Sequence, residues 1–153
     1  MKTKWILFIV LIFGTLSACQ SATSSPEVAA NVGTEFSLAP GQSAVVADAG
    51  MTITFHAVTG DDRCPSEVEC AASGPVSVSL SVQQGDEAPT DITLQTFTDH
   101  SGRAPSVPFE GLTNPAEVGG YLIQLVGVTP YPENPEIKIE ASEYRVTLLV
   151  SKP

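Results

Sequence analysis

The sequence predicts an all-β fold: an antiparallel β-sandwich of about seven or eight strands, of an immunoglobulin-like kind, with a small β-barrel as the alternative. Two observations lead to this prediction. Apolar and polar residues alternate along several short segments, which is typical of strands buried on one face. Turn-forming clusters such as APGQ, TGDD and PYPENP separate these segments, and the chain after residue 34 shows no long helical period.

The clearest strand is predicted at residues 76–82, where apolar residues alternate with three serines. The same alternation predicts strands at residues 51–57 and 144–150. Residues 121–128 are apolar on both faces apart from Gln124, which indicates a central strand. Shorter strands are predicted at residues 35–38, 43–47, 92–94 and 137–139.

Two positions depart from this alternation. Phe97 falls out of the pattern set by Ile92 and Leu94, which predicts a bulge or the end of a strand. Residues 114–118 fit one short helical turn, with Pro115 at the first helical position.

The first 18 residues, MKTKWILFIVLIFGTLSA, have the layout of a secretory signal peptide. Lys2 and Lys4 precede an apolar run that extends from residue 5 to residue 16. A permanent signal-anchor helix is the weaker alternative, because a membrane-spanning helix needs roughly 20 apolar residues.

The next residues, Leu16-Ser17-Ala18-Cys19, resemble the lipobox of bacterial lipoproteins. The resemblance implies cleavage before Cys19 and attachment of a diacylglycerol, with fatty acids such as palmitate, to its thiol. It also implies a location on the outward face of a membrane, which is the outer membrane where the host has one, because Gln20 is not an aspartate. Residues 20–34 lack bulky apolar clusters and predict a flexible tether, which leaves residues 35–153 as a single domain.

The charge of the chain restricts its partners. Without residues 1–18, five of the seven basic residues and all 17 acidic residues remain, so the formal net charge is −12. Nucleic acid is excluded as a partner, because its recognition needs a cationic surface. Anionic lipid headgroups would repel this surface too, so attachment to the membrane would depend on the lipid anchor.

The segment DDRCPSEVEC contains the other two cysteines, Cys64 and Cys70. An exported domain lies where disulfides persist, so a disulfide between these two residues is the leading prediction. Zinc and redox sites are weaker alternatives, because the only two histidines lie outside metal-binding spacings and there is no C-x-x-C. A calcium site is a further weak alternative, without the pattern of an EF-hand. Its ligands would be Asp61, Asp62, Glu67 and Glu69.

The longer segment RCPSEVECAASG, residues 63–74, resembles a segment of uncharacterised secreted or lipid-anchored bacterial β-domains. In those proteins R-C-P, a second cysteine and a nearby glycine lie between two strands, and a tryptophan often stands two residues after the second cysteine. Ala72 occupies that position here. The PYP at residues 130–132 also fits. The resemblance implies a β-domain with a disulfide and implies no reaction.

Candidate catalytic residues are few. The sequence contains no G-x-S-x-G element and no phosphate-binding loop. His100, with Asp99, Ser101 and Arg103 beside it, has the residue types of an acid–base site, and they are also the residue types of an exposed loop. His56 alternates with threonines on the expected outer face of a strand. An envelope hydrolase that uses His100 or His56 is therefore the alternative function.

Candidate binding residues lie in two proline-rich segments. Residues 100–118 form a long predicted loop that contains Phe109 and Leu112, and these two side chains would either cover the core or contact a partner. Tyr131 lies between two prolines, where an aromatic side chain would be held rigidly. The predicted function is a non-catalytic binding or assembly module, without a cofactor, that contacts an envelope protein or a surface polymer.

Overall fold

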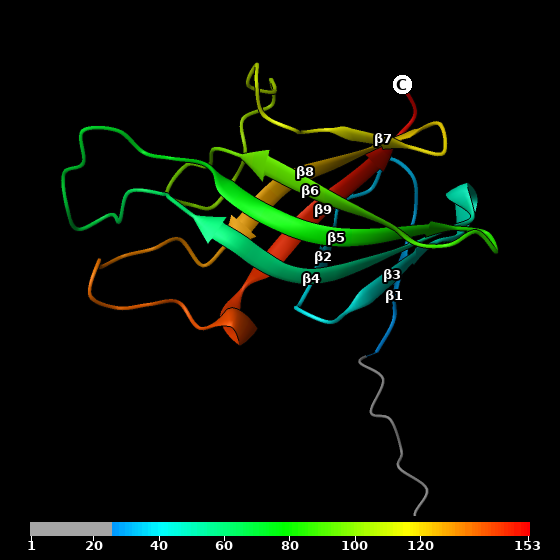
Figure 1. Ribbon diagram of the computed structural model, residues 1–153, viewed down its shortest axis with the longest axis horizontal. Helices are drawn as coiled ribbons and strands as arrows, with labels where there is room; N and C mark the ends of the chain where they lie inside the picture. Colours follow the sequence, from blue (N-terminus) through cyan, green and yellow to red (C-terminus); the bar gives the residue numbers. More distant parts are fainter. Residues whose placement is uncertain (1–25) are drawn as a thin grey trace, which may run out of the picture.

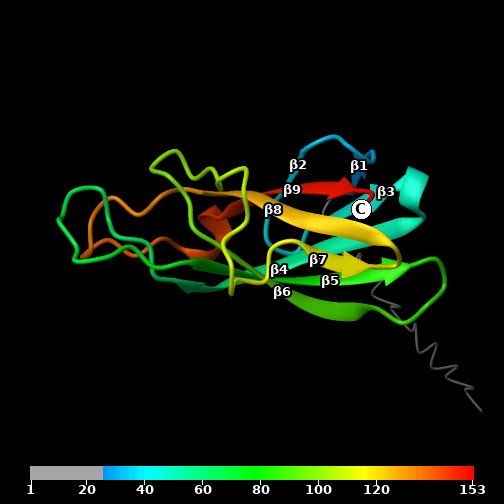
Figure 2. The same ribbon diagram turned by 90° about the horizontal axis from the view of Figure 1, so that it is seen from above.

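The computed structural model describes residues 26–153 as two β-sheets packed face to face (Figures 1 and 2). The five-stranded sheet has the order β1-β3-β4-β5-β6, and the four-stranded sheet has the order β2-β9-β8-β7. The predicted β-sandwich is confirmed, and the described chain does not close into a barrel. The predicted signal peptide and the lipobox with Cys19 lie outside the described residues.

Nine strands and two short 3-10 helices make up the described chain. The five-stranded sheet contains β1 (Val28–Ala30), β3 (Ser43–Val46), β4 (Met51–Asp61), β5 (Val76–Gln84) and β6 (Thr90–Thr96). The four-stranded sheet contains β2 (Phe36–Leu38), β7 (Ala116–Val118), β8 (Tyr121–Thr129) and β9 (Arg145–Ser151). The 3-10 helices are η1 (Ala47–Ala49) and η2 (Ala141–Glu143). No helix in this part of the chain has the length and hydropathy needed to cross a membrane.

The alternation seen in the sequence forms the core. In β5 the four apolar residues from Val76 to Val82 are buried, while the intervening serines remain half-buried on the other face. In β9 the alternating apolar residues Val146, Leu148 and Val150 are fully buried against them from the opposite sheet. Hydrophobic burial along a period of two therefore fixes which face of each sheet lies inside. As expected from Phe97, β6 ends at Thr96.

Three expectations about local structure are corrected. Residues 28–30 form β1 within the predicted tether, because Val28 and Ala30 pair in parallel with β3. The predicted helical turn at residues 114–118 is instead β7, because pairing with β8 satisfies its backbone. Residues 137–139 form no strand, because the turn that begins at Asn134 leaves them without a partner strand in the described chain.

Three long loops leave the sandwich at one end (Figure 1). The strands β4, β6 and β8 all run toward that end, where residues 62–75, 97–115 and 130–144 follow them. We call these three loops together the loop end. Its position on a sandwich resembles that of binding loops in many sandwich proteins, which are held by a rigid scaffold.

Candidate functional site

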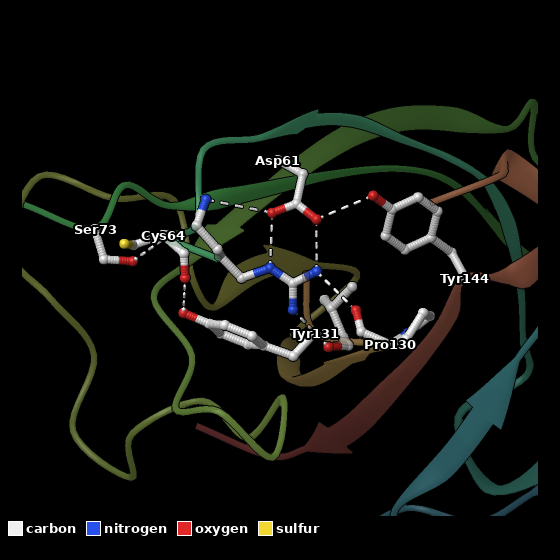
Figure 3. A network of polar contacts seen from close by, with 8 residues as sticks. Asp61, Cys64, Ser73, Pro130, Tyr131 and Tyr144 are labelled. Atoms are coloured by element: carbon white, nitrogen blue, oxygen red, sulfur yellow. Dashed lines mark hydrogen bonds and ion pairs between the residues drawn. The ribbon is translucent and has the colours of Figure 1, made fainter. Parts of the chain in front are cut away.

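A buried ion pair lies at the base of the loop end (Figure 3). Arg63 donates from Nε to Asp61 Oδ1 at 2.7 Å and from Nη2 to Asp61 Oδ2 at 2.6 Å. Its remaining donors reach backbone carbonyls, with Nη1 to Val128 O and Nη2 to Pro130 O, both at 2.9 Å. The Arg63 side chain is fully buried, so this planar group joins the end of β4 to the end of β8.

Tyr131 packs beside this ion pair (Figure 3). Its hydroxyl donates to the carbonyl oxygen of Cys64 at 2.8 Å. The guanidinium carbon of Arg63 lies 5.0 Å from the centre of the Tyr131 ring, within the range of a cation–π contact. The imidazole of His100 lies on the ring as well, with centroids 4.9 Å apart. Tyr131 therefore joins all three loops.

The RCP segment at residues 63–65 and the PYP segment at residues 130–132 contact one another. Besides the contacts of Arg63 and Tyr131, the backbone N–H of Ser66 donates to Pro132 O at 3.0 Å. The N–H of Glu67 donates to Glu133 O at the same distance. The loop that begins with the RCP segment and the loop that begins with the PYP segment are thus joined by several hydrogen bonds.

The charges at this base are tightly held. Burial pushes the pKa of Asp61 upward, but the hydrogen bonds and charge of Arg63, together with the hydroxyl of Tyr144, outweigh it and lower the pKa. Tyr144 donates to Asp61 Oδ2 at 3.0 Å. Burial, followed by the neighbouring carboxylate, raises the pKa of Tyr144 to about 12. Asp61 is therefore ionised and Tyr144 neutral at physiological pH.

The disulfide between Cys64 and Cys70 is confirmed, with an S–S distance of 2.05 Å. It closes a loop whose ends are six positions apart. The Cys64 N–H also receives support from outside this small loop, because it donates to Ser73 Oγ at 3.0 Å. The disulfide and the Tyr131 hydroxyl thus hold Cys64 from two sides.

Removal of the disulfide, by reduction or by Cys64→Ser with Cys70→Ser, is expected to lower the free energy of unfolding by about 2 kcal/mol. The effect is small because a short loop loses little entropy when it is closed. Urea unfolding with and without reductant measures it, and the double serine variant, which reductant should not affect, is the control. Two free thiols at these positions in protein isolated without reductant would contradict the assignment.

The loop at residues 97–115 begins with a turn built around Asp99. The Asp99 Oδ1 atom accepts hydrogen bonds from the Ser101 N–H, the Ser101 hydroxyl and the Arg103 N–H, at 2.9, 2.6 and 3.0 Å. Those bonds, chiefly the one from the Ser101 hydroxyl, lower the pKa of Asp99. Its carboxylate is therefore used to shape the loop, as in an Asx turn.

The same loop is attached to the sandwich further along. Gly102 accepts a hydrogen bond at its carbonyl from the Val128 N–H at 2.8 Å, and the Ala104 N–H donates to Val126 O at 3.0 Å. Residues 102–104 thus run beside β8, with one isolated antiparallel bridge between Arg103 and Gly127. The first half of the loop is consequently fixed to the scaffold.

The histidines gain little support as catalytic residues. The neighbour of His100 that would orient it as a base, Asp99, is committed to backbone and hydroxyl donors. His100 itself is exposed and packs on Tyr131. His56 is exposed on β4, as its alternation with threonines predicts.

The acidic residues near the disulfide do not assemble a metal site. Both oxygens of Asp61 are bonded to Arg63, and one of them also accepts from Tyr144. Within residues 26–153, no three histidine, cysteine or acidic side chains gather in a way that would hold a metal ion. The calcium alternative built on Asp61, Asp62, Glu67 and Glu69 therefore receives no support from the geometry.

The exposed large hydrophobic side chains of the described chain lie on the loop end. In the described chain, the exposed large hydrophobic residues are Val68 at 41%, Val107 at 74%, Phe109 at 52% and Ile137 at 72%. All four lie on the three loops, at least one on each. Phe109 packs edge-on against Phe97, with ring centroids 4.7 Å apart, so one face of it is supported while about half of the residue remains in solvent.

Leu112 and Tyr131, the other predicted contact residues, are half-buried. Leu112 therefore offers less surface to a partner than Phe109. Tyr131 serves mainly as a support, because its hydroxyl and ring are both engaged within the loop end. The interpretation of Tyr131 as a direct contact is accordingly less favoured than its role in holding the loops together.

Arg63 is the residue whose role sequence reasoning missed. Few basic residues occur in the chain, and this one stands in an acidic segment directly before a cysteine, which is the available signal. Comparison with protein-family models, with curated proteins and with solved structures finds no match for this chain. The functional interpretation below therefore depends on the geometry of the loop end.

Proposed function

We propose that this protein is a lipid-anchored component of the bacterial cell envelope, whose β-sandwich binds a partner protein through the loop end and performs no catalysis. The observation that carries the proposal is the placement of every exposed large hydrophobic residue of the described chain on these three loops. Exposed large apolar side chains that are confined to one end of a domain indicate an interaction surface there.

The rigidity of the loops supports the proposal. Arg63 and Tyr131 join the three loops by hydrogen bonds and ring contacts, and the disulfide closes the first of them. A surface that is already ordered loses less conformational entropy when it binds. The same exposed residues on loops without such contacts would bind a partner with lower affinity, because the loops would have to become ordered on binding.

The charge of the loop end indicates the chemistry of the partner. Its three loops contain nine acidic and three basic side chains, and one of those three, Arg63, is neutralised by Asp61. A partner surface that combines apolar and basic side chains would complement it. An anionic surface polymer fits this charge poorly, so a protein partner is favoured over a polymer.

The envelope location has two supports of its own. The lipobox resemblance at Leu16 to Cys19 implies a lipid anchor, and the Cys64–Cys70 disulfide is of the kind found in exported proteins. Mass spectrometry of the mature protein tests the anchor, since the proposal requires a chain that begins at an acylated Cys19. A chain that retains residues 1–18 would overturn it.

Amine cross-linking of the full-length protein in its native envelope is expected to trap a discrete heavier species. After residue 18 the chain has only two lysines, Lys138 on the loop end and Lys152 near the C-terminus. The C-terminus lies away from the loop end (Figure 1), so the partner should be attached at Lys138 and not at Lys152. Peptide mass spectrometry distinguishes the two positions.

Two variants sharpen this experiment. The change Val107→Asp with Phe109→Ser is expected to reduce the cross-linked species at least about tenfold, because it removes exposed apolar contacts. Ala88→Asp, in the exposed turn between β5 and β6, is the control and should leave the yield unchanged. A protein found only as an acylated monomer, or attached only through Lys152, would overturn the proposed binding role.

A further inference from the structure

Within residues 26–153, one edge of β4 has no partner strand over its last residues. On the edge that faces β3, pairing between β3 and β4 extends to Thr54. Phe55 then bonds with the turn before β3: its N–H donates to Gln42 O at 3.0 Å, and its carbonyl accepts from the Gly41 N–H at 2.7 Å. Beyond Phe55, residues 56–61 pair only with β5 among the described residues. Backbone donors and acceptors are therefore available at this edge.

The unpaired edge forms one wall of a groove with a volume of about 530 Å³. The strand side of the groove consists of Val58, Thr59, Gly60 and Asp61. The loop at residues 130–144 forms the opposite side with Pro132, Pro135, Ile137 and Ile139. A free strand edge that faces apolar side chains is the arrangement used to bind extended peptides, since the backbone supplies affinity and the side-chain pockets supply specificity.

The inner end of the groove is rigid and offers no unpaired charge. Arg63, Asp61 and Tyr144 line it, and the Asp61 carboxylate accepts hydrogen bonds from both the Arg63 guanidinium and the Tyr144 hydroxyl. The fixed base holds the end of β4 at a set distance from the loop. The groove is therefore preformed in the absence of a ligand.

The loop side of the groove is acidic. Residues 130–144 contain four glutamates, Glu133, Glu136, Glu140 and Glu143, against one lysine, Lys138. The two ion pairs found among the described residues, Arg63 with Asp61 and Arg103 with Glu35, include none of these five. Of these five residues, Glu140 and Lys138 line the groove itself. A segment with basic side chains would therefore meet Glu140 in the groove and an excess of carboxylates on the rest of the loop.

The shape of β4 favours a short segment over a second copy of the chain. Two register shifts interrupt its pairing with β5, between Phe55 and Ala57 and between Val58 and Gly60. Bulges of this kind twist a strand and discourage long, regular edge-to-edge pairing. A few residues of extended chain can still follow the edge.

We propose that the groove binds a short, extended, basic segment of the partner protein as an additional strand on β4. Its backbone would pair with residues 56–61, one set of side chains would pack on Ile137 and Ile139, and lysine or arginine side chains would face the glutamates of the 130–144 loop. This inference rests on the proposed function, since it names how that partner is bound.

The test uses the mature full-length protein in detergent and a blocked eight-residue peptide of alternating valine and lysine. Hydrogen exchange should show protection of the backbone amides of residues 56–61 when this peptide is added. Two comparison peptides, one with glutamate in place of lysine and one with alternate N-methylated amides, should bind at least about tenfold more weakly. The glutamate peptide would be repelled by the acidic loop, and the N-methylated peptide lacks the N–H groups needed for backbone hydrogen bonds with β4.

Ile137→Ser is expected to weaken the binding of the lysine peptide about tenfold, and Ala88→Ser, in the exposed turn between β5 and β6, is the control. Ile137 is 72% exposed and lines the groove, whereas Ala88 is exposed and lies outside both the groove and the loop end. Absence of protection at residues 56–61, equal binding of the N-methylated peptide, or equal effects of the two variants would overturn the proposal.

Other occupants give different results. Protection of residues 56–61 without peptide that disappears when residues 20–25 are deleted would assign the edge to the chain's own N-terminal segment. Protection that rises with protein concentration would assign it to a second copy. If the partner is still cross-linked at Lys138 in the native envelope, either result overturns only the proposal that a peptide segment binds at β4. If no partner is cross-linked at Lys138, the proposed binding function is overturned as well.

Discussion

Replacement of Arg63 by methionine is expected to lower the free energy of unfolding by about 3–5 kcal/mol. Methionine fills much of the same space but leaves the carboxylate of Asp61 without its counter-charge. The carbonyls of Val128 and Pro130 also lose the donors that reach them at 2.9 Å. Urea unfolding of the purified domain measures the loss. It should exceed that caused by removal of the disulfide, although the disulfide is the covalent link.

Arg103→Met is the matched control for this change. Arg103 also makes a two-bond pair with a carboxylate, to Glu35 at 2.8 and 2.9 Å, but its side chain is 55% exposed while that of Arg63 is fully buried. Exposed pairs contribute about 0–1 kcal/mol, so a small effect is expected. Arg63→Lys should recover only part of the stability, because an ammonium group cannot span both oxygens and both carbonyls. Equal losses in the Arg63 and Arg103 variants would contradict the assigned role.

The same variant should alter the pH dependence of stability. Because the pKa of Asp61 is lowered below its ordinary value of 3.8, the ion pair stabilises the folded state at neutral pH. That contribution declines as the pH falls through the folded-state pKa. Without Arg63, burial would favour the protonated carboxyl group. The difference in unfolding free energy between the wild type and Arg63→Met should therefore narrow as the pH falls from neutral to below 3.8.

The β-sandwich could be predicted because the alternation of buried and exposed residues is visible within the sequence of each long strand. In β5 the alternation of valine and leucine with serine assigns each residue to one face without knowledge of its neighbours. The short elements were less predictable, because their identity depends on distant partners. The sequence of residues 116–118 resembles the start of a helix, yet these residues form a strand because they pair antiparallel with β8. Residues 28–30 likewise become a strand through β3.

The candidate site was predictable in its parts and not in its arrangement. Cys64, His100 and Tyr131 were each identified from local composition, but their contacts join residues up to 67 positions apart. The buried ion pair of Arg63 with Asp61 is the feature that the sequence prediction most clearly missed. Arginine is ordinarily exposed, so nothing in the local sequence of Arg63 indicates that Asp61 and two distant carbonyls would enclose it. The unpaired edge of β4 was hidden for a similar reason, since it depends on where β3 begins.

Gly102→Ala is expected to destabilise the protein by about 2–5 kcal/mol, in two separate ways. Gly102 has a φ of 81°, a conformation that is strained for alanine. A Cβ at this position would also overlap the carbonyl oxygen of Val128 and lie 2.8 Å from the Cγ2 atom of Thr129. Relief of that overlap requires separation of residues 102–104 from β8, which would release the first half of the 97–115 loop.

Gly111→Ala separates the two causes. Gly111 has nearly the same φ, 87°, and lies in the same loop, but a Cβ there would have no atom within 4 Å. Its expected loss is about 1–2 kcal/mol, from backbone strain alone. Thermal and urea unfolding of both variants measure the difference, and hydrogen exchange at the Val128 amide reports whether its bond to Gly102 opens. If the two variants lose equal stability and the Val128 amide stays protected, the attachment of this loop to β8 does not hold the loop end in place. The rigidity on which the binding proposal depends would then have to come from Arg63 and Tyr131 alone.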